Sequence, residues 1–417
     1  MSVTGERDQG SAGRVDAVRA FYESHPYPEP VATLDKRLDR YRDPRRRHAQ
    51  NLLLWPLEKA RSDRAILVAG CGTSQAARHA LMEPEARVIA IDISETSLRH
   101  TGDLRKKHDI RNLRLHRLAI ERVAELGETF DQIVCTGVLH HLSDPDAGLR
   151  SLRNVLARDG AMHIMVYAPY GRAGVYMMQD YCRLLGVGVT DAELRELGET
   201  LQALPVDHPI AGVVKRAKDF VQAHALADAL LNPQDRAYSV PELYDWLERC
   251  DLKFGRWHEQ APYLPQCGAI GRAPHGARLA ALPPRAQHAA LELLRGTMDR
   301  HSFIAYRGDR EREAQPITFE GEGWRGFVPV RLPWALTIKD RAPRGVTAVL
   351  INPSHMYPDL ALLIDAAQER LLTAIDGERS IAEILQSAGE TIGDEQGRQF
   401  FRRLWEHDLI VLDAKRL

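Results

Sequence analysis

Two short segments carry residue types suited to binding a nucleoside ligand. The first is LVAGCGTSQ, residues 67–75, in which an apolar run breaks at Gly70 and Gly72. Glycines at such a break let the backbone approach a ligand, because no Cβ atom stands in the way. The second is RVIAID, residues 87–92, which ends in Asp92. A carboxylate there can accept hydrogen bonds from both hydroxyls of a ribose.

The glycine loop argues against a ligand that is held by its phosphates. A dinucleotide fingerprint needs a third glycine three residues after Gly72, whereas the chain continues Thr73-Ser74-Gln75. The P-loop pattern, which ends in Gly-Lys-Ser/Thr, is missing from the sequence. A ligand with a ribose and no phosphate fits better, and S-adenosylmethionine (SAM) is such a ligand. Ser74 is expected either to contact its methionine end or to cap the following helix.

The surrounding residues predict the elements that must position these segments. Apolar strands are expected at residues 65–70, 87–92, 113–120, 130–137, 161–168, 252–260 and 301–307, with amphipathic helices between them. This alternation indicates parallel βαβ units and a doubly wound α/β sheet. Ligands of such sheets bind beyond the carboxyl ends of the strands, and both segments follow a strand there.

The chain divides by composition into several expected parts. Residues 1–13 are expected to be a disordered tail, and residues 14–64 an N-terminal helical cap. Residues 65–308 form the expected SAM-binding domain, interrupted by a helical insertion at 170–235. Residues 317–417 form a small C-terminal accessory domain, mainly helical and similar to a winged helix.

The order of these motifs resembles the class I SAM-dependent methyltransferases over roughly residues 15–307. The resemblance is carried by ILVAGCGTSQ (66–75), VIAIDIS (88–94), the segment 130–167 and the late strands. It is closest to a subgroup with an Asn-Pro-Tyr-Pro-type N-terminal motif, here His25-Pro26-Tyr27-Pro28, and a GCGT loop. It implies a Rossmann-like seven-stranded sheet whose last strand is antiparallel, and SAM as the cofactor.

The resemblance also implies roles for individual residues. The expected cofactor contacts are Tyr27, Ala69, Gly70, Cys71, Gly72, Ser74, Asp92, Ile93, Ala119, Ile120, Thr136 and Gly137. Among them, Asp92 binds the ribose, and Tyr27, held between prolines, forms a lid over SAM. Three departures from the family pattern are Val68, where many members have an acid, Ser74, where a third glycine is usual, and Ala119-Ile120-Glu121, which lacks a clear Asp for the adenine amine.

Three residues are candidates for a catalytic role. His140 is either a general base or a packing residue below the site, and Tyr167 and Tyr170 stand at the end of the fifth strand. Asp235, Arg236 and Tyr238 are further candidates for the acceptor pocket, which the insertion is expected to build. No metal site is expected, because a metal needs three converging ligands and no spacing pairs a third residue with His140-His141.

Composition bears on location and partners. The net charge of −1 counts against nucleic acid as a partner. No apolar run is long enough to cross a membrane, and the five cysteines lack CxxC spacing, so a cytoplasmic protein is expected. We expect methyl transfer to a small molecule. The alternatives are a protein or peptide methyltransferase that recognises its partner through residues 317–417, and a non-catalytic SAM-binding or DNA-binding regulator. The oligomeric state stays open.

Overall fold

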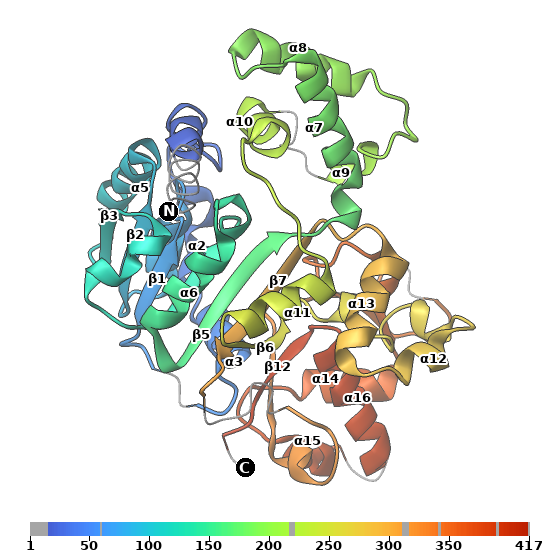
Figure 1. The fold of residues 1–417 in the computed structure, drawn as a ribbon. Helices are drawn as coiled ribbons and strands as arrows, with labels where there is room; N and C mark the ends of the chain where they lie inside the picture. The colour runs from blue at the N-terminus through green and yellow to red at the C-terminus, as the bar shows by residue number, and fades with distance from the viewer. Residues whose placement is uncertain are drawn as a thin grey trace, which may run out of the picture. The chain divides into compact units, whose positions relative to one another are not determined.

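The computed structural model (Figure 1) describes residues 16–58, 61–216, 222–310, 317–340, 343–388 and 392–415. They fall into two units. The first takes in the described residues up to Tyr41, Ser62–Lys253 and Glu292–Arg310. The second takes in the described residues of Arg42–Arg61, Phe254–Leu291 and the segment from Ile317 onward. The two units thus share the residues of the expected N-terminal cap. The expected disordered tail, 1–13, lies outside the described residues.

The largest sheet has seven strands in the order β3-β2-β1-β4-β5-β7-β6. The strands are β1 (Ala65–Ala69), β2 (Arg87–Asp92), β3 (Leu113–Arg117), β4 (Phe130–Thr136), β5 (Leu156–Tyr167), β6 (Leu252–Trp257) and β7 (Arg300–Arg307). β1 pairs in parallel with β2 and β4, whereas β7 runs antiparallel to β5. Every residue of β1 is buried, as its continuous apolar run predicts for a strand covered on both faces. The predicted doubly wound sheet is confirmed.

The helices between the strands begin where the sequence predicts. They are α4 (Gln75–Met82), α5 (Glu95–Lys107), α6 (Pro145–Val155) and α11 (Val240–Arg249). The Ser94 side chain caps α5 by accepting a hydrogen bond from the backbone N–H of Ser97. Asp144 caps α6 in the same way, and Pro145 occupies its first position. These caps fix where each loop at the carboxyl edge of the sheet ends.

The insertion is helical, as expected, and gathers beyond the end of β5 (Figure 1). It contains α7 (Ala173–Leu185), α8 (Asp191–Gln202), α9 (Ala211–Arg216), α10 (Ala223–Leu226) and a π-helical turn at Ala227–Leu231. Its apolar faces form a core of their own, which includes Val175, Leu194 and Leu197. Phe21, from the helix over residues 16–24, is buried in that core. The N-terminal helix is therefore anchored to the insertion.

The second unit has its own apolar core. Its helices include α3 (Pro44–Leu54), α14 (Ala366–Thr373), α15 (Ile381–Ser387) and α16 (Asp394–Glu406). It also has β8 (Val328–Arg331), β9 (Leu336–Ile338), β10 (Ala348–Ile351), β11 (Leu362–Ile364) and β12 (Ile410–Asp413), in two small sheets. The sequence predicts a mainly helical domain over residues 317–417, without these strands. Strands of three or four residues are too short to show an alternating pattern.

Three strands have boundaries that differ by three residues or more from those predicted, and one of them, β6, ends at Trp257 rather than at residue 260. β3 ends at Arg117, and a 3₁₀ helix, Ile120–Leu126, follows it. β5 begins at Leu156 rather than at residue 161, because residues 158–160 stay in the strand. Among the described residues, no helix combines the length and the apolar character that crossing a membrane requires.

Candidate functional site

A cavity of about 360 Å³ lies in the first unit, at the carboxyl ends of the central strands. Its walls come from the loop after β1, the ends of β2, β4 and β5, and the start of the 3₁₀ helix after β3. Much of the remaining wall comes from the N-terminal helix, the insertion, the residues after β4 and the start of β7. The volume falls within the range of small-molecule sites, and the position is the one at which open parallel sheets bind ligands.

The loop after β1 needs glycine at two positions. Gly70 and Gly72 have φ angles of +68° and +54°, which residues other than glycine rarely adopt. A Cβ on Gly72 would lie 2.6 Å from the backbone oxygen of Tyr27, and one on Gly70 would overlap the Val138 side chain. The Gly70 N–H donates to the Ile91 oxygen at 2.9 Å, so the loop is held against the end of β2.

Asp92 joins the glycine loop to β2. Its Oδ2 accepts a hydrogen bond from the Gly72 N–H at 2.8 Å, and its Oδ1 accepts one from the Ser94 N–H at 2.9 Å. Burial raises the pKa of Asp92 above its usual value, although these backbone donors oppose the shift. Each oxygen keeps a second lone pair, and the residue lines the cavity. The carboxylate can therefore accept further hydroxyl donors.

The N-terminal proline motif lies against the glycine loop. Tyr27 and Pro28 line the cavity, in agreement with the expected position of Tyr27. The Thr73 hydroxyl donates to the Pro28 oxygen at 2.7 Å. The His25 ring stacks on Phe21 at 5.5 Å, and its Nε2 lies 3.1 Å from the Val189 oxygen. The motif thus contacts both the loop and the insertion.

Most of the expected cofactor contacts line the cavity. They are Tyr27, Gly70, Cys71, Gly72, Asp92, Ile93, Ala119, Ile120, Thr136 and Gly137. Ala69 and Ser74 are fully buried outside its lining. Ala69 is the last residue of the central strand β1, which explains its burial. The Ser74 side chain also makes no capping bond to α4, so neither role expected for it is seen.

A polar cluster stands on the insertion side of the cavity. Tyr22 and Tyr167 donate their hydroxyls to the two oxygens of Asp228, at 2.8 and 3.3 Å. Asn232 donates to the Tyr22 oxygen at 3.0 Å. Burial, followed by the charge of Asp228, raises the pKa of both phenols well above the usual value, so they stay protonated donors. Asp228 is 3% exposed, and the hydrogen bonds it accepts in the described chain come from uncharged groups.

Of the expected catalytic residues, only Tyr167 lines the cavity. Tyr170 is 43% exposed and lies outside the lining, in the short 3₁₀ helix Tyr170–Arg172 that follows β5. His140 is fully buried behind the cavity, with its ring 3.9 Å from that of Tyr167. Burial, with smaller contributions from His141 and Arg172, lowers the pKa of His140 well below its usual value, so the ring is neutral.

Several polar residues line the cavity although the sequence did not assign them to it, among them Tyr22, His141, Arg172 and Asp228. Tyr22 and Asp228 lie in helices without a recognisable motif, and they meet only because the insertion folds back. Arg172 donates to Asp235 at 3.1 Å, and its guanidinium stacks 3.5 Å above the Tyr167 ring. The sequence predicts Asp235 as an acceptor-pocket residue because it lies at the end of the insertion.

The other two pocket candidates pack against each other. Tyr238 is fully buried and stacks on Trp246 at 4.5 Å, and the guanidinium of Arg236 lies 4.6 Å above the Tyr238 ring. Neither residue lines the cavity.

Comparison with known proteins agrees with this architecture. Residues 67–162 match the family described as a methyltransferase domain. Together with the sheet order, this match defines a Rossmann-like methyltransferase fold. The chain is 34% identical over 209 residues to an uncharacterised protein of Synechococcus sp., covering 48% of this chain. The chain spans about half the length of that relative (50%).

Two solved structures share the fold over most of the chain. One is PKMT2 from Rickettsia typhi, with a TM-score of 0.61 and 15% identity, covering 89% of this chain and 75% of that one. The other is the same protein in complex with AdoHcy, with a TM-score of 0.60 and 13% identity, covering 93% and 77%. At these identities, the likeness concerns the fold alone.

The glycine loop allows a direct test of its packing. Gly72→Ala adds both backbone strain and an overlap with the Tyr27 oxygen, whereas Gly127→Ala adds strain at φ +65° with no heavy atom within 4 Å of the new Cβ. Each positive φ costs roughly 1–2 kcal/mol for alanine. We expect Gly72→Ala to lower the free energy of unfolding by about 1 kcal/mol or more beyond Gly127→Ala, because of the overlap. Urea denaturation measures both, and equal losses would contradict the close packing.

Proposed function

We propose that this protein is a SAM-dependent methyltransferase. The supporting observation is the hydrogen bond between the Gly72 N–H and the Asp92 carboxylate in the cavity. It holds the glycine loop beside a carboxylate that can accept hydrogen bonds from ribose hydroxyls. Both residues lie within the segment that matches a methyltransferase domain. The N-terminal motif, in contact with the same loop, supports membership of the subgroup with a His-Pro-Tyr-Pro motif and a GCGT loop.

The residues of the cavity suit a reaction that depends on alignment. Bound SAM supplies a methyl group on a sulfonium, and the departing sulfur is neutral, so no residue has to protonate it. Asp92 and the glycine loop would hold the cofactor, and the insertion would keep water away from the reacting atoms. Asp228, with its two tyrosine donors, would bind a polar group of the acceptor. It can also hold a proton that the acceptor loses.

The acceptor that fits this site best is a small molecule. The cavity is of small-molecule size, and all of its lining residues belong to the first unit. A peptide or protein acceptor is the second candidate, favoured by the separate folded core that residues 317–417 contribute to. A regulatory DNA-binding role is less favoured, because two arginines of α16 are engaged by acids. Arg398 pairs with Glu395, and Arg402 with Glu406.

We also propose a cytoplasmic location and no nucleic-acid partner. All five cysteines are free thiols and buried, which is typical of proteins in a reducing compartment. The net charge of −1 does not provide the basic excess that phosphate contacts need.

Asp92→Ala tests the cofactor side. Removing two charge-assisted hydrogen bonds to the ribose, each worth about 1.5–3 kcal/mol, should weaken SAM binding by about 100-fold or more. Isothermal titration calorimetry with SAM and S-adenosylhomocysteine measures the affinity, and circular dichroism checks the fold. Asp103→Ala, at an exposed position on α5, is the matched control and should bind as the wild type does. An unchanged affinity in Asp92→Ala would refute the ribose assignment.

Asp228→Asn tests the acceptor side. The protein is incubated with methyl-labelled SAM and a cell extract separated into small-molecule and protein fractions. We expect label to enter the small-molecule fraction. Asp228→Asn should slow this by about tenfold, because an amide loses the charge that binds or deprotonates the acceptor, while SAM affinity should stay unchanged.

The labelling of the wild type and of Asp228→Asn separates the candidate functions. Label in the protein fraction that depends on Asp228 would favour the peptide or protein acceptor. Tight SAM binding without label in either fraction would favour the regulator. A wild-type rate in Asp228→Asn would remove Asp228 from the acceptor site.

A further inference from the structure

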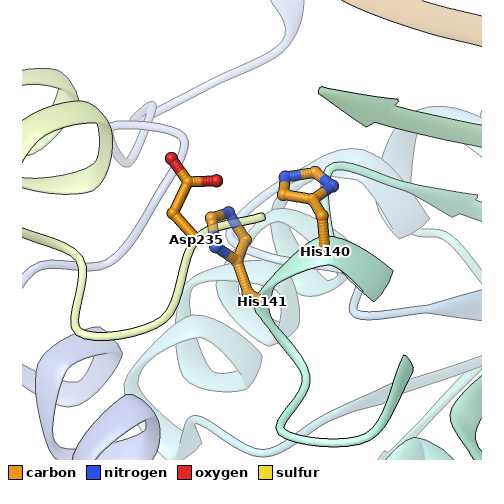
Figure 2. A group of neighbouring side chains, drawn as sticks. All are labelled: His140, His141 and Asp235. Carbon is orange, nitrogen blue, oxygen red and sulfur yellow. The ribbon is translucent and has the colours of Figure 1, made fainter. Parts of the chain in front are cut away.

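Three side chains of the metal-ligand type meet beside the cavity (Figure 2). His140 and His141 come from the 3₁₀ turn after β4, and Asp235 comes from the segment before α11. One ligand atom from each residue lies within 4.8 Å of the others. His140 is fully buried, His141 nearly so, and the Asp235 side chain is 3% exposed. Figure 2 shows the two imidazoles and the carboxylate facing the same space.

Polar atoms in this cluster lack partners. Among the described residues, neither ring nitrogen of His140 makes a hydrogen bond, and Oδ1 of Asp235 makes none either. A buried polar atom without a partner costs about 1–3 kcal/mol. A hydrogen bond between His140 and Asp235 would satisfy one polar atom on each residue, but it would not engage the Nε2 atom of His141. An ion at the centre would engage all three residues.

The neighbours leave one ligand atom available on each of the other two residues. His141 Nδ1 lies 2.6 Å from the Gln234 oxygen, which can only accept, so Nδ1 carries the proton and Nε2 keeps its lone pair. Asp235 Oδ2 accepts hydrogen bonds from Arg172 at 3.1 Å and Gln179 at 2.9 Å, which leaves Oδ1. Outer contacts of this kind orient the ligands of established metal sites.

We propose that His140, His141 and Asp235 bind one divalent transition-metal ion, of which Zn²⁺ is the best match. Two imidazoles and a carboxylate suit zinc and its neighbours, whereas Mg²⁺ and Ca²⁺ take mainly oxygen ligands. Three protein ligands leave a fourth coordination position. That position is reached from the cavity, because His141 and Gln234 are part of its lining.

The charges around the cluster permit a cation. Arg172 is positive and close, but it is paired with Asp235. Asp228 brings a second carboxylate through its contact with Tyr167, whose ring stacks against His140. Arg172, Asp228 and Asp235 together therefore carry one net negative charge.

The test is metal binding by the full-length chain without an affinity tag. After dialysis against a chelator, Co²⁺ is titrated in and its visible absorption bands are followed. We expect one Co²⁺ per chain, displaced by Zn²⁺. His141→Gln and Asp235→Asn should each weaken binding by at least about tenfold. In metal sites, the loss of a residue that only hydrogen-bonds to a ligand lowers the metal affinity by about 10–100-fold, and the loss of a ligand should lower it by no less.

His116→Gln, at an exposed position on β3, is the matched control and should bind Co²⁺ as the wild type does. Circular dichroism establishes that the variants fold. The proposal would be overturned if the wild type did not bind Co²⁺, or if both ligand variants bound Co²⁺ as tightly as the wild type. A thiolate charge-transfer band would also overturn it. The result does not depend on methyl transfer, because metal binding and S-adenosylhomocysteine binding are measured separately.

Discussion

The hydrogen bond from the Gly72 N–H to the Asp92 carboxylate is the contact on which the site depends. It holds the loop after β1 against the end of β2, where the Ile91 oxygen also accepts hydrogen bonds from the N–H groups of Gly70 and Cys71. The loop reaches this position only with positive φ angles, which explains the glycines. The Tyr27 oxygen then packs against Gly72 at a distance that leaves no room for a Cβ. The loop geometry therefore also places the N-terminal motif.

The N-terminal helix carries this placement across the cavity. Phe21 lies in the core of the insertion, and the next residue, Tyr22, donates its hydroxyl to Asp228. The same short helix is therefore fixed both to the loop after β1, through the residues that follow it, and to the insertion, through its apolar face. Burying a carboxylate among uncharged donors is unfavourable for folding. That unfavourable burial is a physical reason to expect Asp228 to act on a ligand.

The side of the cavity to which we assign the cofactor could be predicted from the sequence, and the side to which we assign the acceptor could not. β1 and β2 are continuous apolar runs that end at Gly70 and Asp92, so chain order alone places those residues at one edge of the sheet. Asp228 and Tyr22 are about two hundred residues apart, and no local pattern brings them together. Asp235 reaches His140 through the return of the chain from the insertion, which no ligand spacing reveals. The two roles expected for Ser74 are not seen, because its side chain is buried outside the cavity lining and does not cap α4.

This difference has a physical origin. The cofactor wall is built from backbone N–H groups and strand ends, whose positions follow from the hydrogen bonds of the sheet. The wall to which we assign the acceptor is built from side chains on the N-terminal helix, at the end of β5 and on the helices that follow β5. The positions of those on the helices depend on the packing of an apolar core separate from the sheet. Side chains there can change without altering the loop after β1. Changes at Asp228 and at Asp92 should therefore act independently, because the two carboxylates share no hydrogen-bond partner among the described residues.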